Sequence, residues 1–221
     1  MVLVPFARLR VRGDLPAPPF ILAANHVSPV DPAVLMAACQ VRGVAPRFLA
    51  DAAVFRMRTI GWIMRRAGHI PVARGTATVT ESLARAAAAV RAGAVVLVYP
   101  EGRIGRDPGL WPEKGKTGTA RLALTTGAVV VPVAQWGTHE VVPYSAPRGA
   151  VRGLLRAALR RPEVTVGFGP PVRVTGTPRE ATEQIMAAIA ATLAPLRAGE
   201  PDLPRHLDPT RPVTTARSRP R

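Results

Sequence analysis

The amino-acid sequence predicts an α/β fold: a single domain with a mixed, mostly parallel central sheet flanked by helices. Three observations indicate this class. Short β-branched runs alternate with longer alanine-rich stretches at helical spacing, as in sheets covered by helices. The 221 residues suit one domain with a hydrophobic core, and hydrophobic residues make up 48% of them. No internal repeat is evident.

The expected elements follow one another along the chain. A short strand and a proline-rich loop precede a buried strand at 20–25 (FILAAN), and a helix follows over 29–41. Further strands are expected at 46–51, 69–74, 94–100, 128–136 and 163–169. Further helices are expected at 53–68, 76–93, 116–125 and 178–196. The helix over 76–93 is the best delimited, because Thr78 or Thr80 can cap it and Gly93 can end it.

Composition divides the chain near residue 198. Residues 1–197 carry the alternating strands and helices and are expected to form the folded domain. Residues 198–221 are rich in proline and arginine and have almost no apolar content, so we expect a disordered tail. Cys39 is the only cysteine, which excludes a disulfide framework and fits a reducing compartment.

The net charge of +16 favours a partner that carries negative charge. An anionic membrane surface, a phosphorylated substrate and nucleic acid are the three candidates. Lysine occurs only at Lys114 and Lys116 in a chain that otherwise uses arginine, which indicates either a site or two chance loop lysines. A basic nucleic-acid-binding protein is the non-enzyme alternative. Only 5% of residues are aromatic and no nucleic-acid-binding motif is present, so no nucleic-acid partner is expected.

The segment 146–162 predicts contact with a membrane surface. Arg148, Arg152, Arg156 and Arg160 recur every four residues, and apolar residues gather on the other side. Such a basic amphipathic helix suits an anionic lipid interface; the alternative is a helix packed on the sheet with a solvated arginine face. No apolar stretch is long enough to span a bilayer and no signal peptide is visible. The expected location is cytoplasmic, peripheral on the inner face of the cell membrane, without a transmembrane helix.

The segment 25–31 (NHVSPVD) carries the residues best suited to chemistry. If Ser28 caps a helix, Pro29 takes its first position and Asp31 its third, which is the spacing of a capping box. The Asp31 carboxylate can then bond one ring nitrogen of His26, leaving the other nitrogen free to accept a proton. The pair predicts a general base with an orienting carboxylate; the alternative is a capping box beside an incidental histidine.

Other potential chemical residues receive structural interpretations. A structural role is expected for His69, His139 follows a predicted strand, and His206 lies in the predicted tail. Ser28 lacks the G-x-S-x-G surroundings of a nucleophile. No HExxH motif, paired cysteines or carboxylate cluster occurs, so no metal site is expected.

Four sequence blocks, in order, resemble those of the glycerolipid acyltransferase family, which includes the 1-acylglycerol-3-phosphate (lysophosphatidic acid) acyltransferases. Residues 25–31 are similar to the family's NHxSxxD block. The later blocks are similar to 68–75 (GHIPVARG), 96–107 (VLVYPEGRIGRD) and 129–134 (VVVPVA). The resemblance covers about residues 11–196 and implies the glycerolipid acyltransferase fold.

The resemblance also implies roles for individual residues. His26 is expected to deprotonate the acceptor hydroxyl, and Asp31 is expected to orient the His26 ring. The hydroxyl then attacks an acyl thioester directly, without an acyl-enzyme intermediate. Arg74 of the second block is expected to contact the acceptor's phosphate. In the third block, Glu101 and Gly102 precede further basic residues that bind the same acceptor.

The third block departs from the family pattern Glu-Gly-Thr-Arg-Ser. The chain has Ile104 at the position of the expected arginine, and arginines lie beside it at Arg103 and Arg106. Arg103 is one candidate for the missing phosphate contact. Lys116 is the other, because it lies in a GKTG sequence that opens the next predicted helix, where backbone amides also favour an anion.

The reaction that the resemblance implies is acyl transfer from acyl-CoA or acyl carrier protein to the sn-2 hydroxyl of 1-acylglycerol 3-phosphate, giving phosphatidic acid. The acyl thioester is a co-substrate, and no cofactor or metal is expected. Another lysophospholipid or a lyso-aminolipid is the alternative acceptor. The expected partners are therefore the lysophospholipid, the acyl thioester and an anionic membrane surface.

Overall fold

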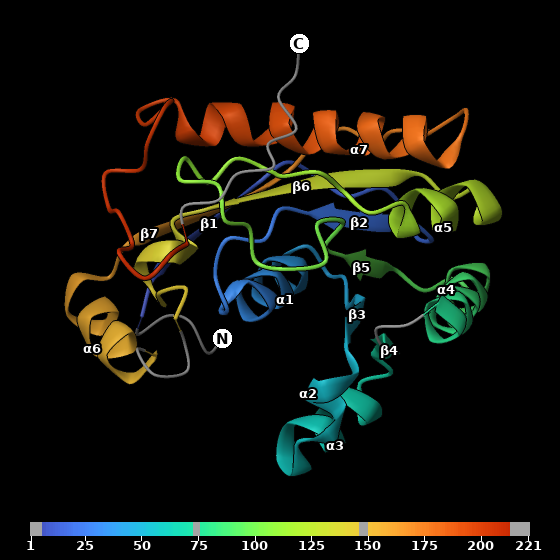
Figure 1. Ribbon diagram of the computed structural model, residues 1–221, viewed down its shortest axis with the longest axis horizontal. Coiled ribbons are helices and arrows are strands. Elements are labelled where there is room, and N and C mark those ends of the chain that lie inside the picture. The colour runs from blue at the N-terminus through green and yellow to red at the C-terminus, as the bar shows by residue number, and fades with distance from the viewer. Residues whose placement is uncertain (1–5, 73–75, 146–149, 213–221) are drawn as a thin grey trace.

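The computed structural model describes residues 6–72, 76–145 and 150–212 (Figure 1). Within these ranges the strands are β1 Arg8–Arg12, β2 Ile21–Ala24, β3 Arg47–Asp51, β4 Ile70–Val72, β5 Val96–Val98, β6 Val130–Trp136 and β7 Glu163–Phe168. They form one seven-stranded sheet in the order β1-β7-β6-β2-β5-β3-β4. Every neighbouring pair is parallel except β6 and β7. The mixed, mostly parallel sheet expected from the sequence is confirmed.

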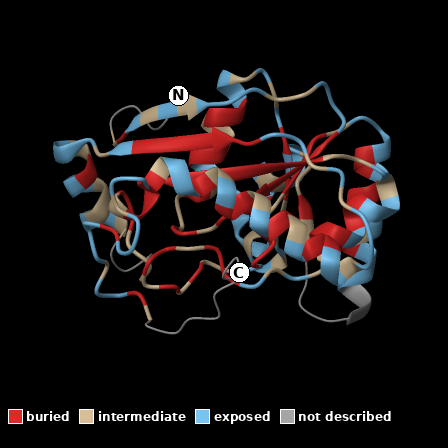
Figure 2. Ribbon diagram, turned by 90° about the horizontal axis from the view of Figure 1, so that it is seen from above, coloured by how far each residue is buried: buried red, intermediate tan, exposed pale blue. Residues whose placement is uncertain are grey.

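Helices cover both faces of this sheet, while α2 and α3 project beyond β3 and β4 (Figure 1). The α-helices of the described residues are α1 Asp31–Val41, α2 Ala52–Arg56, α3 Arg58–Arg66, α4 Thr76–Arg91, α5 Gly118–Thr126, α6 Ala150–Arg160 and α7 Pro178–Leu193. Buried residues of α1 and α6 join one hydrophobic cluster, and those of α4, α5 and α7 join the other. Strands β2, β5, β6 and β7 are largely buried between these layers, whereas β1 at the edge of the sheet and the outer helix faces are partly exposed (Figure 2).

Burial on both faces explains the uninterrupted apolar composition of β2. Leu22 and Ala24 pack into the cluster that contains α1, and Ile21 and Ala23 pack into the cluster that contains α4, α5 and α7. A strand with helices on both faces has no side that favours polar residues. Loops that follow the parallel strands β2 and β5 leave the sheet at the same edge, where open α/β sheets place their ligand sites.

The single helix expected over 53–68 is wrong, because the structure contains two helices there. Met57 separates α2 from α3 with an extended backbone, ψ 132°. Gly61 approaches the Phe55 carbonyl so closely that an added Cβ would lie 2.1 Å from its oxygen. The Arg65 guanidinium also donates to that carbonyl at 2.6 Å. The apolar spacing correctly predicted helical structure on both sides of Met57. The packing of α3 against α2 interrupts the helix at that residue.

Residues 198–212, the described part of the expected tail, follow one buried arginine and contain another. Arg197 just before it is 1% exposed, lies over the rings of Trp111 and Trp136, and donates to the Gly109 carbonyl. Arg211 is 9% exposed and donates to carbonyls near the carboxyl edge of the sheet. The low apolar content that indicated disorder is offset by guanidinium groups that bind loop carbonyls. Residues 213–221, the rest of that predicted tail, lie outside the described residues.

Candidate active site

The loop that follows β2 is positioned by an amide pair with β6. The Asn25 side chain donates to the Gln135 carbonyl at 3.1 Å and accepts from the Gln135 N–H at 2.8 Å. The Gln135 side chain in turn donates to the Asn25 carbonyl at 3.0 Å. Asn25 and Gln135 are both buried. Their hydrogen bonds extend the pairing of β2 with β6 beyond Ala24 and thereby fix the position of the next residue, His26.

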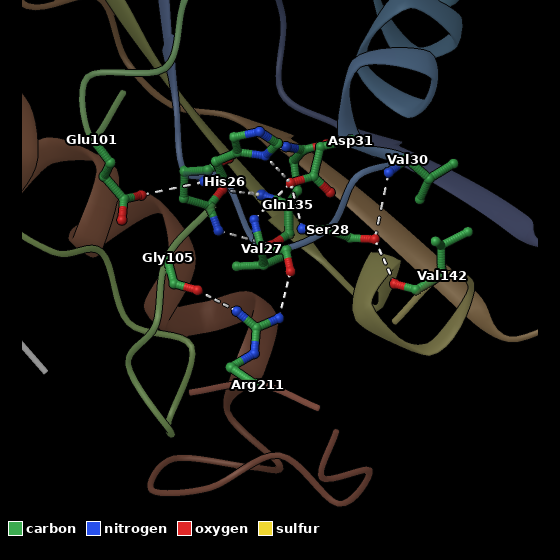
Figure 3. A network of polar contacts seen from close by, with 11 residues as sticks. His26, Val27, Ser28, Val30, Asp31, Glu101, Gly105, Gln135, Val142 and Arg211 are labelled. Atoms are coloured by element: carbon green, nitrogen blue, oxygen red, sulfur yellow. Dashed lines mark hydrogen bonds and ion pairs between the residues drawn. The ribbon is translucent and has the colours of Figure 1, made fainter. Parts of the chain in front are cut away.

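The block-one turn, residues 25–31, holds a histidine against a buried carboxylate (Figure 3). His26 Nδ1 lies 2.8 Å from Asp31 Oδ2. The same oxygen accepts the N–H groups of Val27 at 2.6 Å and Ser28 at 2.9 Å. Asp31 is fully buried, whereas the His26 side chain keeps 15% of its surface exposed. The carboxylate therefore favours the tautomer protonated at Nδ1, which leaves Nε2 as the proton acceptor.

The predicted helix cap at Ser28 is wrong, although the predicted contact between Asp31 and His26 is confirmed. Helix α1 begins at Asp31, and its early proline is Pro32 rather than Pro29. The Ser28 hydroxyl donates to the Val142 carbonyl at 2.8 Å, a partner far away in sequence. The Ser28 hydroxyl is therefore turned toward Val142, and the Val27 and Ser28 amides bind the Asp31 carboxylate. Asp31 thus bonds backward from the first helical residue.

Tyr99, at the end of β5, stacks on the histidine. The two ring centroids are 4.2 Å apart and the rings are inclined by 20°. Burial, followed by the nearby Asp31 charge, raises the pKa of the Tyr99 hydroxyl well above its ordinary value, so the phenol stays neutral. Tyr99 was not among the site residues predicted from the sequence, although its position directly before Pro100 and Glu101 was a usable signal. The stacked ring restricts how far the imidazole can rotate.

The block-three loop, residues 101–113, contains three buried carboxyl groups: Asp107 accepts N–H groups within the loop, and Glu101 and Glu113 make the longer connections. Glu101 accepts the His26 N–H at 3.3 Å and the Glu113 N–H at 3.1 Å. Burial is the main cause that raises the Glu101 pKa to about 8. The Glu113 carboxylate pairs with the Arg103 guanidinium at 2.9 Å and accepts the Arg106 N–H at 3.0 Å. Glu101 therefore connects the block-three loop to the block-one turn as a mostly neutral carboxyl group at pH 7.

The basic residues expected to bind phosphate have different surroundings. Arg103 is engaged by Glu113, whereas Lys116 is exposed and its ammonium lies beside Gly102, 3.0 Å from the position of an added Cβ. Gly102 has a φ of +66°, a conformation that suits glycine. Helix α5 begins at Gly118, so Lys116 precedes it instead of opening it. Arg74 lies outside the described residues.

Two other histidines have structural surroundings. His69 accepts the Phe48 N–H through Nδ1 at 3.1 Å, and burial lowers its pKa. His139 packs against Trp136, and burial lowers its pKa to about 4, so it is neutral at pH 7. His26, by contrast, belongs to the block-one turn and hydrogen-bonds Glu101 and Gly105 of the block-three loop.

Taken together, a histidine oriented by a buried carboxylate stands at the carboxyl edge of a mostly parallel sheet, beside a loop that carries Arg103 and Arg106. The fold and this site define a class of enzyme in which a histidine base can activate a hydroxyl acceptor. The family follows from sequence: the model described as Acyltransferase matches residues 8–136, and the chain belongs to this family.

Individual relatives agree with this family. A chloroplastic 1-acyl-sn-glycerol-3-phosphate acyltransferase, BAT2 of Brassica napus, is 29% identical over 163 residues, which cover 72% of this chain and 46% of the relative. The lyso-ornithine lipid O-acyltransferase of Pseudomonas aeruginosa is 32% identical over 141 residues, 63% of this chain and 51% of the relative. The chain thus spans about half the length of these relatives.

A solved structure has the same fold. The 1-acyl-sn-glycerophosphate (LPA) acyltransferase PlsC of Thermotoga maritima superposes with a TM-score of 0.68 at 22% sequence identity. The superposition covers 87% of this chain and 73% of that protein. It confirms the acyltransferase fold that the four sequence blocks implied.

Proposed function

We propose that this protein transfers a fatty acyl group from an acyl thioester to the sn-2 hydroxyl of 1-acylglycerol 3-phosphate. The observation that carries the proposal is the contact between His26 Nδ1 and Asp31 Oδ2, which directs Nε2 to receive a proton. As Nε2 removes the hydroxyl proton, the oxygen attacks the thioester carbonyl. The carbon–sulfur bond then breaks, and the thiol leaves with the proton returned by the imidazolium. The products are phosphatidic acid and free coenzyme A or acyl carrier protein.

The charge of the site supports an anionic acceptor. Lys116 lies exposed next to Gly102, and Arg103 retains 38% side-chain exposure while paired with Glu113. An ammonium and a partly exposed guanidinium can both donate hydrogen bonds to phosphate oxygens. A lyso-aminolipid acceptor is the second candidate, favoured by the 32% identity to the lyso-ornithine lipid enzyme.

The test of this function is acyl transfer from labelled acyl-CoA and from acyl carrier protein to both acceptors, with His26→Ala as the comparison. Loss of a general base is expected to lower the rate by roughly two to four powers of ten. Equal rates in the two proteins would remove His26 from the mechanism. Product from the lyso-aminolipid alone would transfer the proposal to that acceptor, and product from neither acceptor would refute it.

The surface of α6 supports a membrane location for this reaction. Val151, Leu155 and Leu159 are exposed by 70%, 64% and 88%, so the apolar side of the helix is not covered by the sheet. Arg152 and Arg156 are exposed beside them. The alternative in which only arginines face solvent does not fit these exposures, whereas an anionic bilayer would receive both kinds of side chain.

Helix α3 presents a second surface of the same kind. Ile60, Trp62 and Ile63 are 43%, 57% and 50% exposed, and the Arg66 guanidinium lies over the Trp62 ring. No helix within the described ranges is long and apolar enough to cross a membrane. We therefore propose that the protein binds at the bilayer surface through α3 and α6.

Sedimentation with vesicles tests this surface. Binding to vesicles that contain phosphatidylglycerol should fall at least about tenfold for Leu155→Asp and for Ile63→Asp, since each change removes apolar burial and adds repulsion. Leu124→Asp is the matched control, because Leu124 is 36% exposed on α5, which covers the other face of the sheet. Equal binding of all four proteins would contradict the proposed surface.

A further inference from the structure

A C-terminal arginine reaches the candidate active site and joins its two loops. Arg211 is nine-tenths buried, and its guanidinium donates to the carbonyl oxygens of Val27 and Gly105 (Figure 3). Val27 belongs to the block-one turn and Gly105 to the block-three loop. A single side chain therefore spans two segments that are far apart in sequence.

Val27 and Gly105, whose carbonyls Arg211 binds, both adjoin the His26 backbone. Gly105 donates its N–H to the His26 carbonyl at 2.7 Å, and the Val27 N–H donates to Asp31 at 2.6 Å. The peptide groups on either side of Val27 are thus held by Asp31 and by Arg211. If the Arg211 contact is lost, the Val27 carbonyl and the Gly105 carbonyl must both find other donors. The orientation of the His26 backbone depends on these peptides.

The segment that carries Arg211 is itself fixed. The Arg211 N–H donates to the Asp208 carbonyl at 3.1 Å, and the Asp208 carboxylate accepts the N–H groups of Tyr144 and Thr210. The guanidinium carbon lies 5.3 Å from the centre of the Tyr144 ring. Tyr144 also receives a hydrogen bond from Arg106 at 3.2 Å through its hydroxyl. These contacts present the guanidinium to the two carbonyls in one orientation.

The sequence of the block-three loop gives this contact further meaning. Residue 104, where the family pattern has arginine, is isoleucine, and the next residue is Gly105, whose carbonyl Arg211 binds. We propose that Arg211 is a positioning residue for acyl transfer, which supplies from the C-terminal segment a guanidinium that holds the His26 turn against the block-three loop. This inference rests on the proposed function for its rate prediction, but the geometry that it describes can be tested without substrate.

The shape of the side chain predicts how substitutions behave. A guanidinium is a planar fork that donates to two separated carbonyls, whereas a lysine ammonium is a single point with a shorter reach. Arg211→Met should therefore lose both contacts, and Arg211→Lys should keep one of them. Arg205→Met is the matched control, because Arg205 lies in the same segment, is exposed, and its guanidinium donates to the Gly199 carbonyl rather than to the active-site loops.

Steady-state kinetics test the positioning role. Small displacements of a catalytic group cost up to about a hundredfold in rate, so Arg211→Met should lower kcat roughly ten- to a hundredfold while KM changes less than about threefold. Arg211→Lys should be intermediate and Arg205→Met should equal the wild type. Added guanidinium chloride at millimolar concentration should partly restore Arg211→Met and leave His26→Ala inactive. An unchanged kcat per folded Arg211→Met molecule would overturn the proposal, even if its Tm were lower.

A measurement without substrate separates this inference from the proposed function. Hydrogen exchange at the Val27 and Ser28 amides and the chemical shifts of the His26 ring, both followed by NMR, should change in Arg211→Met and not in Arg205→Met. Unchanged exchange and unchanged ring shifts would overturn the positioning role, whatever the acceptor. If the wild type makes no product while these signals do change, the proposed reaction fails and the structural role of Arg211 stands.

Discussion

The block-one turn and the block-three loop meet at His26, and two kinds of contact can be compared there. In the block-one turn, the Asp31 carboxylate binds His26, Val27 and Ser28, all within five residues. In the block-three loop, Glu101 binds His26 across 75 positions, and Arg211 binds Gly105 across 106. The first arrangement is written into a short stretch of sequence, while the second exists only once the fold has brought distant segments together.

The strongest test of this difference is to break the block-one turn at its acceptor. Asp31→Asn replaces an oxygen that accepts three hydrogen bonds with a group that can also donate, and it removes the negative charge beside the imidazole. Acyl transfer should fall by about a thousandfold, because the histidine loses both its orienting partner and the stabilisation of its protonated form.

The measurement is kcat per folded molecule, with circular dichroism to establish the folded fraction. Asp14→Asn is the control, since the Asp14 side chain is 96% exposed and its ion pair with Arg42 is long, at 3.9 Å. A rate for Asp31→Asn within a factor of about three of the wild type would show that local orientation of His26 is not required.

In the block-three loop, the buried Glu101 carboxyl group should make the free energy of unfolding depend on pH. The Glu101 pKa is about 8 in the folded protein, against an ordinary value of 4.5, because burial disfavours the charged form. The unfolded chain therefore releases this proton at a lower pH than the folded protein. The free energy of unfolding should fall as pH rises from about 4.5 to about 8, by up to about 4 kcal/mol from this group.

Urea unfolding at pH 5, 6.5 and 8 measures this effect in the wild type and in Glu101→Gln, which remains neutral throughout. As pH rises, the free energy of unfolding should fall more for the wild type than for Glu101→Gln. Glu183→Gln, at an exposed position on α7, serves as the control for a lost carboxylate. Parallel stability curves for the wild type and Glu101→Gln would contradict the raised pKa.

The smallest expected effect separates two cations of the block-three region. Lys116→Met should raise KM for 1-acylglycerol 3-phosphate about tenfold with little change in kcat, as one charge-assisted contact to phosphate is lost. Arg103→Met should instead lower stability, because it leaves the buried Glu113 carboxylate without its ion pair.

Lys114→Met is the matched control, as Lys114 is the other lysine of the chain and is also exposed. An acceptor without phosphate should show no change in KM with Lys116→Met. If Arg103→Met rather than Lys116→Met raised the KM for the phosphate acceptor, the phosphate contact would belong to Arg103.

The same contrast between local and distant contacts explains what the sequence could predict. Buried strands such as β2 and β6 were predictable because helices on both faces demand apolar runs. The contact between His26 and Asp31 was predictable because five residues and one turn decide it. The stacking of Tyr99, the carboxyl group of Glu113 and the reach of Arg211 depend on segments whose meeting no local pattern reports.

The error at Ser28 has the same origin. Ser28 has the sequence signature of a helix cap, yet its hydroxyl binds the Val142 carbonyl, which local spacing cannot reveal. Arg211, in the segment expected to form a tail, likewise binds distant loop carbonyls. In both cases the partner is a distant carbonyl oxygen that no local pattern indicates.

The contact between Arg211 and Val27 has a consequence for when the protein becomes active during its synthesis. The two residues are 184 positions apart. At about 5–20 residues per second, a ribosome needs roughly ten to forty seconds to add Arg211 after Val27. The nascent chain can form β2, α1 and the turn between them in that interval, but the Val27 carbonyl has not yet met its guanidinium. Full catalytic competence would then arise after translation has passed residue 211.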